Sequence, residues 1–79
     1  MSVRDQVIAQ FETVARQQEK PLVPLDDAVP LAETGLDSLC FAIIVARLED
    51  ALGVDPFATS GEFPVTFGDF VALYEPAPD

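Results

Sequence analysis

The stretch ETGLDSLCFAIIVARLED, residues 33–50, places a short polar step directly before a long and mostly apolar run. Asp37 and Ser38 are residues of the kind that cap a helix, because their side-chain oxygens can accept a hydrogen bond from its first N–H groups. We therefore predict a helix that begins at Asp37 or Ser38 and runs to about Leu52. Gly53 follows as a residue that readily ends a helix.

Two further helices are predicted, one near each end of the chain. Apolar residues recur at steps of three and four over residues 2–18, which is typical of a helix with one buried face. Ser2 and Asp5 form a capping pair in front of that helix. Thr66 and Asp69 form a similar pair before the last apolar segment, which is predicted to be the third helix.

The remaining patterns complete an all-α prediction. Asp55 and Pro56 indicate a short helical turn over residues 56–60, because proline is favoured at the first position of a helix. No segment alternates between apolar and polar residues as a strand would. A length of 79 residues with 49% hydrophobic composition fits one small folded domain. We assign that domain to residues 1–79, with 76–79 as a flexible tail.

Residues 20–37 form a long connection between the first two helices. Pro21, Pro24 and Pro30 punctuate it, and each disfavours helix at the residue before it. Connections of this length are unusual in so short a chain and are often functional. Apolar residues lie between the prolines, so we predict that this connection packs across the domain.

The charge of the chain narrows the classes of partner. Fourteen acidic residues face four basic ones, which gives a formal net charge of −10. No basic residue occurs over residues 21–46 or after Arg47. Such a surface repels nucleic acid and anionic lipid, and it attracts proteins with basic patches. Solubility would explain some of these acids, but it does not account for the base-free middle of the chain.

The hydropathy of the chain argues against a membrane protein. The longest apolar run, residues 39–46, is too short to cross a bilayer. Charged and amide side chains interrupt the apolar residues of the first segment, so it does not resemble a signal peptide. We therefore expect a cytoplasmic protein with no stable membrane insertion.

Most catalytic chemistry is excluded by residue type. The chain has no histidine, which removes Ser-His-Asp catalysis and the commonest metal ligand. Asp26, Asp27, Glu33 and Asp37 do not have the spacing of a calcium-binding loop. Cys40 is the single cysteine, and no histidine or nearby base would activate its thiol. We expect no catalytic residue and no metal site.

Ser38 allows two readings. A serine that follows an aspartate at the start of a helix is most simply a cap. If Asp37 is the cap instead, the hydroxyl of Ser38 is free to be modified. The free N–H groups and the dipole at a helix N-terminus favour a phosphate there.

At this point the chain resembles the acyl carrier protein family, which includes peptidyl and polyketide carriers. The residues that carry the resemblance are Gly35-Leu36-Asp37-Ser38-Leu39. The order of segments agrees along essentially the whole chain. The resemblance implies an acyl-carrier-like four-helix bundle, with three longer helices, one short helix and a long loop between helices 1 and 2.

The same resemblance implies a cofactor and partners. Ser38 would bear 4′-phosphopantetheine, installed from coenzyme A by a phosphopantetheinyl transferase whose metal and coenzyme A are oriented by Asp37. The thiol of this arm would hold acyl or aminoacyl groups as thioesters, and the chain would have no catalytic activity of its own. The further partners would be a loading ligase and an acyl transferase or synthase. We expect the carrier to be a monomer.

The helix after Ser38 has two predicted faces. Helical spacing leaves Cys40, Ile43 and Arg47 nearer the solvent. The alternative is a helix that is buried all round, and the pattern does not decide between the two. The residues expected to face the core are Phe41, Ala42, Ile44, Val45, Leu48 and Leu52.

This helix also departs from the family pattern. Carriers of fatty-acid synthesis commonly have acids two and five residues after the serine, where this chain has Cys40 and Ile43. With Arg47, and with Leu36 and Leu39 beside the serine, these residues form the predicted partner-binding surface. The missing acids indicate a specialised, free-standing carrier for a lipid or secondary-metabolite pathway.

A rival hypothesis needs no cofactor. A small acidic helical module could dock on a basic protein surface, and the net charge and the long loop fit that role equally well. The sequence GLDSL at a helix start favours the carrier.

Overall fold

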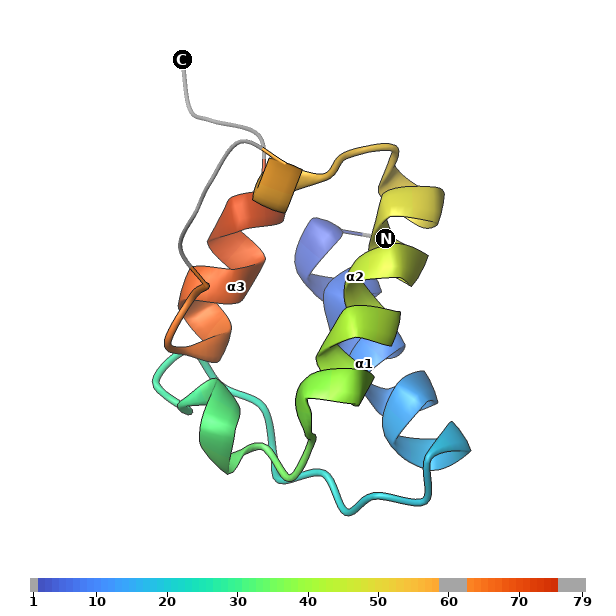
Figure 1. Cartoon of the computed structure of the whole chain (residues 1–79). Coiled ribbons are helices and arrows are strands. Elements are labelled where there is room, and N and C mark those ends of the chain that lie inside the picture. Colours follow the sequence, from blue (N-terminus) through green and yellow to red (C-terminus); the bar gives the residue numbers. More distant parts are fainter. Residues whose placement is uncertain (1, 59–62, 76–79) are drawn as a thin grey trace.

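The chain forms helices joined by irregular segments (Figure 1). This computed structural model describes residues 2–58 and 63–75. Within these ranges there is no strand, and one isolated antiparallel bridge joins Pro30 to Thr66. The all-α prediction is therefore confirmed. The elements in chain order are α1 (Val3–Gln17), the 3-10 turn η1 (Leu31–Glu33), α2 (Ser38–Leu52), the 3-10 turn η2 (Pro56–Ala58) and α3 (Phe67–Tyr74).

All three α-helices begin at the predicted caps. The hydroxyl of Ser2 accepts a hydrogen bond from the backbone N–H of Asp5 at 3.1 Å, at the start of α1. The hydroxyl of Thr66 accepts one from the backbone N–H of Asp69 at 3.1 Å, at the start of α3. Asp37 caps α2. Each cap satisfies a donor that the helix itself leaves without a partner.

The C-terminus of α1 closes in a Schellman motif. The backbone N–H of Glu19 donates to the carbonyl of Arg16, and that of Lys20 donates to the carbonyl of Ala15 at 2.8 Å. This pattern requires a left-handed residue after the cap, which is glycine in most proteins. Here the residue is Glu19, with φ of 55°. The motif fixes the direction in which Lys20 leaves the helix.

The hydrophobic core lies where α1 packs against α2 and α3. Phe11 is fully buried at this junction, and its ring centroid is 5.2 Å from those of Phe67 and Phe70. It also meets the ring of Phe41 edge to face at 6.0 Å. Truncation of such a phenylalanine to alanine typically costs about 3–5 kcal/mol. The buried apolar residues are Val7, Phe11, Val14, Ala15, Leu31, Leu36, Cys40, Phe41, Ile44, Leu48, Phe67, Phe70, Val71 and Tyr74.

The long connection between α1 and α2 is fixed to the start of α3. In Figure 1 it crosses one end of the molecule, and η1 lies beside the first turn of α3. The backbone N–H of Phe67 donates to the carbonyl of Val29 at 2.8 Å, and the N–H of Gly68 donates to that of Asp27 at 3.1 Å. These bonds satisfy N–H groups that the helix leaves free. The prediction that the connection packs across the domain is confirmed.

Arg4 reinforces the same junction from α1. Its guanidinium forms an ion pair with Asp27 and lies 5.6 Å from the centroid of the Phe67 ring. An exposed ion pair contributes little by itself, roughly 0–1 kcal/mol. Here it joins α1, the connection and α3 at a single point.

The predicted short helical turn is present over the part of its range that the structure describes. A turn over residues 56–60 was expected, and the structure has the single 3-10 turn η2 at Pro56–Ala58. Residues 59 and 60, and the expected tail 76–79, lie outside the described residues. The bundle therefore consists of three α-helices and short 3-10 turns within the described part of the chain. Over residues 2–58 and 63–75, no helix is both long and apolar enough to span a bilayer.

Tyr74, at the end of α3, is buried with 5% of its surface exposed. Its hydroxyl finds no hydrogen-bond partner among the described residues. Burial, together with the nearby charges of Asp55 and Glu49, raises the pKa of Tyr74 to about 12 from an ordinary 10.0. The folded state therefore holds the phenol proton more tightly than the unfolded chain does. That contribution to stability is complete below pH 10.0 and is lost as the pH rises towards about 12.

We expect Tyr74→Phe to be at least as stable as the wild type at pH 7, because it removes a buried hydroxyl that has no partner among the described residues. The gain should be about 1 kcal/mol. The variant should also lose less stability than the wild type between pH 10 and pH 12, since it has no phenol to ionise. Urea unfolding at pH 7 and at pH 11 measures both effects. An equal loss of stability in the two proteins at pH 11 would contradict the burial of Tyr74.

Candidate functional site

Ser38 is the first residue of α2, and its side chain is exposed. Asp37 is the cap of this helix, since its Oδ1 accepts a hydrogen bond from the backbone N–H of Cys40 at 3.0 Å. Within the described ranges the Ser38 hydroxyl takes part in no hydrogen bond. Of the two readings of the sequence, capping therefore falls to Asp37, and the hydroxyl of Ser38 is free at the surface.

The carboxyl group of Asp37 is held in its ionised form. The hydrogen bond from the backbone N–H of Cys40 is the main cause that lowers its pKa, and the Cys40 thiol and the positive charge of Lys20 act in the same direction. Lys20 Nζ lies 3.5 Å from Asp37 Oδ2, the oxygen that does not cap the helix. The Asp37 carboxylate thus binds the backbone N–H of Cys40 with one oxygen and the ammonium group of Lys20 with the other.

The turn before α2 is built around Gly35 and Thr34. Gly35 has φ of 97°, and a Cβ atom at this position would lie 2.1 Å from the carbonyl oxygen of Pro21. Thr34 is fully buried, and its hydroxyl donates to the carbonyl of Leu31 at 2.7 Å. The backbone N–H of Val23 donates to the carbonyl of Thr34 at 3.2 Å. The two ends of the long connection are therefore joined directly behind Asp37 and Ser38.

Thr34 is a residue that the sequence reasoning missed. A threonine three residues after an apolar residue and directly before glycine fits a local side-chain-to-backbone hydrogen bond, which was the available signal. That signal indicates a turn, but it does not indicate that the hydroxyl is buried.

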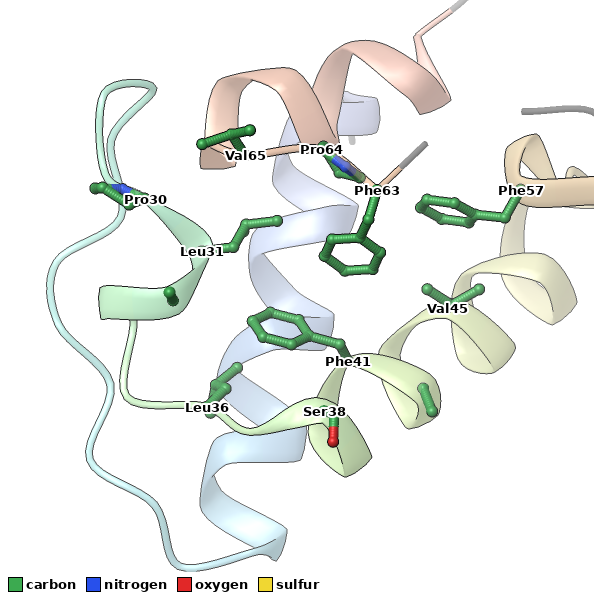
Figure 2. A pocket seen from close by; sticks show the side chains of 12 residues that line it. Pro30, Leu31, Leu36, Ser38, Phe41, Val45, Phe57, Phe63, Pro64 and Val65 are labelled. Carbon is green, nitrogen blue, oxygen red and sulfur yellow. The ribbon is translucent and has the colours of Figure 1, made fainter. Parts of the chain in front are cut away.

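An apolar cleft of about 950 Å³ opens beside Ser38. Figure 2 shows Phe41 and Val45 entering it from α2, Leu31 from η1, and Phe63 from the segment before α3. Among the described residues that line the cleft, Ser38 has the single polar side chain. None of these lining residues is charged. The lining residues are Pro30, Leu31, Ala32, Leu36, Ser38, Phe41, Ala42, Val45, Phe57, Phe63, Pro64 and Val65.

Three aromatic rings form one side of this cleft. Phe63 stacks on Phe57 with their centroids 5.7 Å apart, and it meets Phe41 edge to face at 5.9 Å. Phe63 remains 54% exposed although it belongs to this cluster. A ring in this position leaves apolar surface in contact with water, which an apolar ligand would cover.

The predicted partner-binding surface is only partly present. Cys40 is 1% exposed, so the expectation that its thiol faces partners is wrong. Together with Ile44 and Leu48 it repeats at steps of four and forms the face that α2 turns towards the core. Ile43 is half-buried against the core, which also departs from the expected solvent-facing side.

The other predicted contact residues differ in their surroundings. Leu39 is 60% exposed beside Ser38, as a contact residue would be. Leu36 is 7% exposed and lines the cleft, so it offers little surface to a partner. Arg47 is exposed, and its Nε donates a hydrogen bond to Gln10 on α1. Ala42, which was expected in the core, is exposed and lines the cleft.

Ser38 and the helix that it begins lie within a segment that matches a known protein family. The model of the phosphopantetheine attachment site matches residues 5–59. The chain belongs to this family. The predicted resemblance to acyl carrier proteins is therefore confirmed, and so is the cofactor, 4′-phosphopantetheine, which family members bear covalently and normally on a serine. Searches among curated proteins and among solved structures gave no match.

The surroundings of Ser38 fit the phosphodiester of this cofactor. The first N–H groups of a helix have no carbonyl partner and favour an anion. Asp37 Oδ1 accepts a hydrogen bond from the backbone N–H of Cys40. The backbone N–H groups that precede Cys40 in α2 are therefore not capped by this oxygen. Lys20 adds a positive charge beside them. The described residues include no group of three or more acidic, cysteine or histidine side chains placed to hold a metal ion.

We expect Gly35→Ala to be destabilised by more than 2 kcal/mol, since a left-handed alanine costs about 1–2 kcal/mol and the contact with Pro21 adds to this. The matched control is Gly53→Ala. Gly53 also has positive φ, at 73°, but a Cβ atom there would meet nothing within 4 Å. Thermal or urea unfolding of the two variants measures the difference. Equal losses in both would show that the approach of Pro21 to Gly35 does not hold the turn.

Proposed function

We propose that the chain carries apolar acyl groups as thioesters on a phosphopantetheine arm attached to Ser38. The observation that supports this most directly is the uncharged cleft of about 950 Å³ with Ser38 at its edge. When bound, the cofactor supplies the thiol that forms the thioester. The residues of the chain then position the arm and shelter its cargo.

The lining of the cleft favours acyl over aminoacyl cargo. An ammonium group that entered it would lose its hydration without a charged partner among the described lining residues. An alkyl chain would instead gain about 0.8 kcal/mol for each buried methylene group. Phe63 and Val45 supply part of the apolar surface that such a chain would cover.

The surface around Ser38 supports a specialised carrier. The two positions where fatty-acid-synthesis carriers commonly have acids are taken by Cys40, which is buried, and Ile43, which is half-buried. Exposed apolar residues lie next to the serine and along the cleft, with Leu39 at 60% and Val65 at 68% exposure. A loading ligase and an acyl transferase or synthase that recognise this carrier would therefore rely on apolar contact near the serine. The rest of the strongly acidic surface would steer their approach.

Attachment to Ser38 can be tested by mass. Incubation with coenzyme A and a broad-specificity phosphopantetheinyl transferase should add one phosphopantetheine to the wild type and none to Ser38→Ala. Intact-mass spectrometry provides the measurement, with a known carrier as the positive control. No addition to the wild type, under conditions that modify the control, would exclude the proposed function and leave the cofactor-free binding module as the better hypothesis.

The cargo proposal is tested by thioester hydrolysis. We expect an octanoyl thioester on the modified chain to hydrolyse more slowly than a glycyl thioester on the same protein. Ala42→Phe should remove part of this protection, because a ring at this position would occupy part of the cleft. If the ring keeps about two methylene groups of the octanoyl chain out of the cleft, the thioester should hydrolyse roughly tenfold faster on Ala42→Phe than on the wild type.

The matched control is Ala46→Phe, one helical turn further along α2. Ala46 is exposed and does not line the cleft, so this variant should protect the octanoyl thioester as the wild type does. Hydrolysis is followed by intact mass over time. Equal rates in Ala42→Phe and the wild type would show that the cargo does not enter the cleft.

A further inference from the structure

Lys20 is placed at the start of α2 by the chain that precedes it. The Schellman motif ends α1 and turns the backbone at Glu19, whose φ of 55° is uncommon for a residue other than glycine. The N–H of Lys20 is fixed to the carbonyl of Ala15 at 2.8 Å. Its side chain reaches Asp37, with Nζ 3.5 Å from Oδ2. The cation is thus held one residue away from Ser38.

The charge of Lys20 is isolated in its region. It is the single basic residue over residues 17–46, and it is the one lysine in the chain. Of the three other basic side chains, Arg4 is paired with Asp27, Arg47 is hydrogen-bonded to Gln10, and Arg16 lies in the last turn of α1. An anion at Ser38 would therefore find its positive partner in Lys20.

Asp37 does not need Lys20 in order to cap α2. The cap bond uses Oδ1, whereas the ion pair uses Oδ2. Both partners of the pair are well exposed, and exposed pairs contribute only about 0–1 kcal/mol. Lys20 can therefore turn away from Asp37 at little cost, and the helix start is left unchanged.

We propose that Lys20 binds the phosphodiester of the arm after Ser38 is modified, in place of or together with its contact to Asp37. An ammonium group has three donors, so it can engage a phosphate oxygen and a carboxylate oxygen at once. The phosphodiester also adds a negative charge next to that of Asp37, which strengthens the attraction. Lys20 is thus a positioning residue that holds the base of the arm beside the cleft. This inference rests on the proposed attachment to Ser38.

Because Lys20 is the one lysine, lysine labelled with ¹³C at Cε gives a single side-chain signal in NMR spectra. We expect this signal to shift when the chain is converted to its phosphopantetheine form. The ³¹P signal of the modified chain should differ between the wild type and Lys20→Gln. It should stay unchanged in Arg16→Gln, which removes a cation from the last turn of α1. Lys20→Arg should restore much of the wild-type ³¹P position, since it keeps the charge.

The two proposals fail in distinguishable ways. Intact mass first establishes that every sample is fully modified, and a wild type that cannot be modified contradicts the proposed function. In fully modified samples, a lysine signal that is unmoved by modification, together with the same ³¹P position in the wild type and Lys20→Gln, overturns the role of Lys20. A ³¹P change of equal size in Arg16→Gln also overturns it, because the effect would then be that of general surface charge.

Discussion

The hydrogen bond from the backbone N–H of Cys40 to Asp37 Oδ1 is the contact on which the site depends. It begins α2 at a defined residue, and it leaves the hydroxyl of Ser38 without a structural task. A serine cap at the same place would have used that hydroxyl within the fold. The same bond keeps Asp37 ionised, so a negative charge stands beside Ser38 and attracts Lys20.

The long connection gives this cap its place in space. Its middle is bonded to the first turn of α3 through Val29 and Asp27, and its two ends meet where Pro21 approaches Gly35. Because of these attachments η1 lies opposite α2, and Leu31 becomes one wall of the cleft. The long connection between α1 and α2, although mostly irregular, thus determines the shape of the site.

Sequence reasoning succeeded where short-range chemistry decides the outcome. Ser2 and Thr66 were identified as helix caps, and the start of α2 was narrowed to Asp37 or Ser38, because a cap needs only a side chain and an N–H group a few residues away. The serine was recognised because its motif is also local. The existence of the long loop followed from its prolines in the same way.

The predictions from sequence were wrong where a residue's neighbours come from distant segments of the chain. Helical spacing places Cys40 and Ala42 on different sides of α2, but it does not say which side meets α1 and which meets the cleft. Spacing placed Cys40 nearer the solvent, with a helix buried all round as the open alternative, and it placed Ala42 in the core. In the structure Cys40 is buried and Ala42 is exposed. The cleft was also beyond reach, because Leu31, Phe57 and Phe63 converge only in the folded chain.

Phe41 belongs to the core and to the cleft at once. One neighbour of its ring is Phe11 at 6.0 Å, within the core, and another is Phe63 at 5.9 Å, within the cleft. A smaller residue at this position would enlarge the cleft in which we propose that the cargo binds, but it would also leave a cavity against Phe11. Divergence of such a carrier towards bulkier cargo is therefore constrained at Phe41. Substitutions at Val45 and Phe63, which also line the cleft and are less buried than Phe41, would change the cleft at a smaller cost in stability.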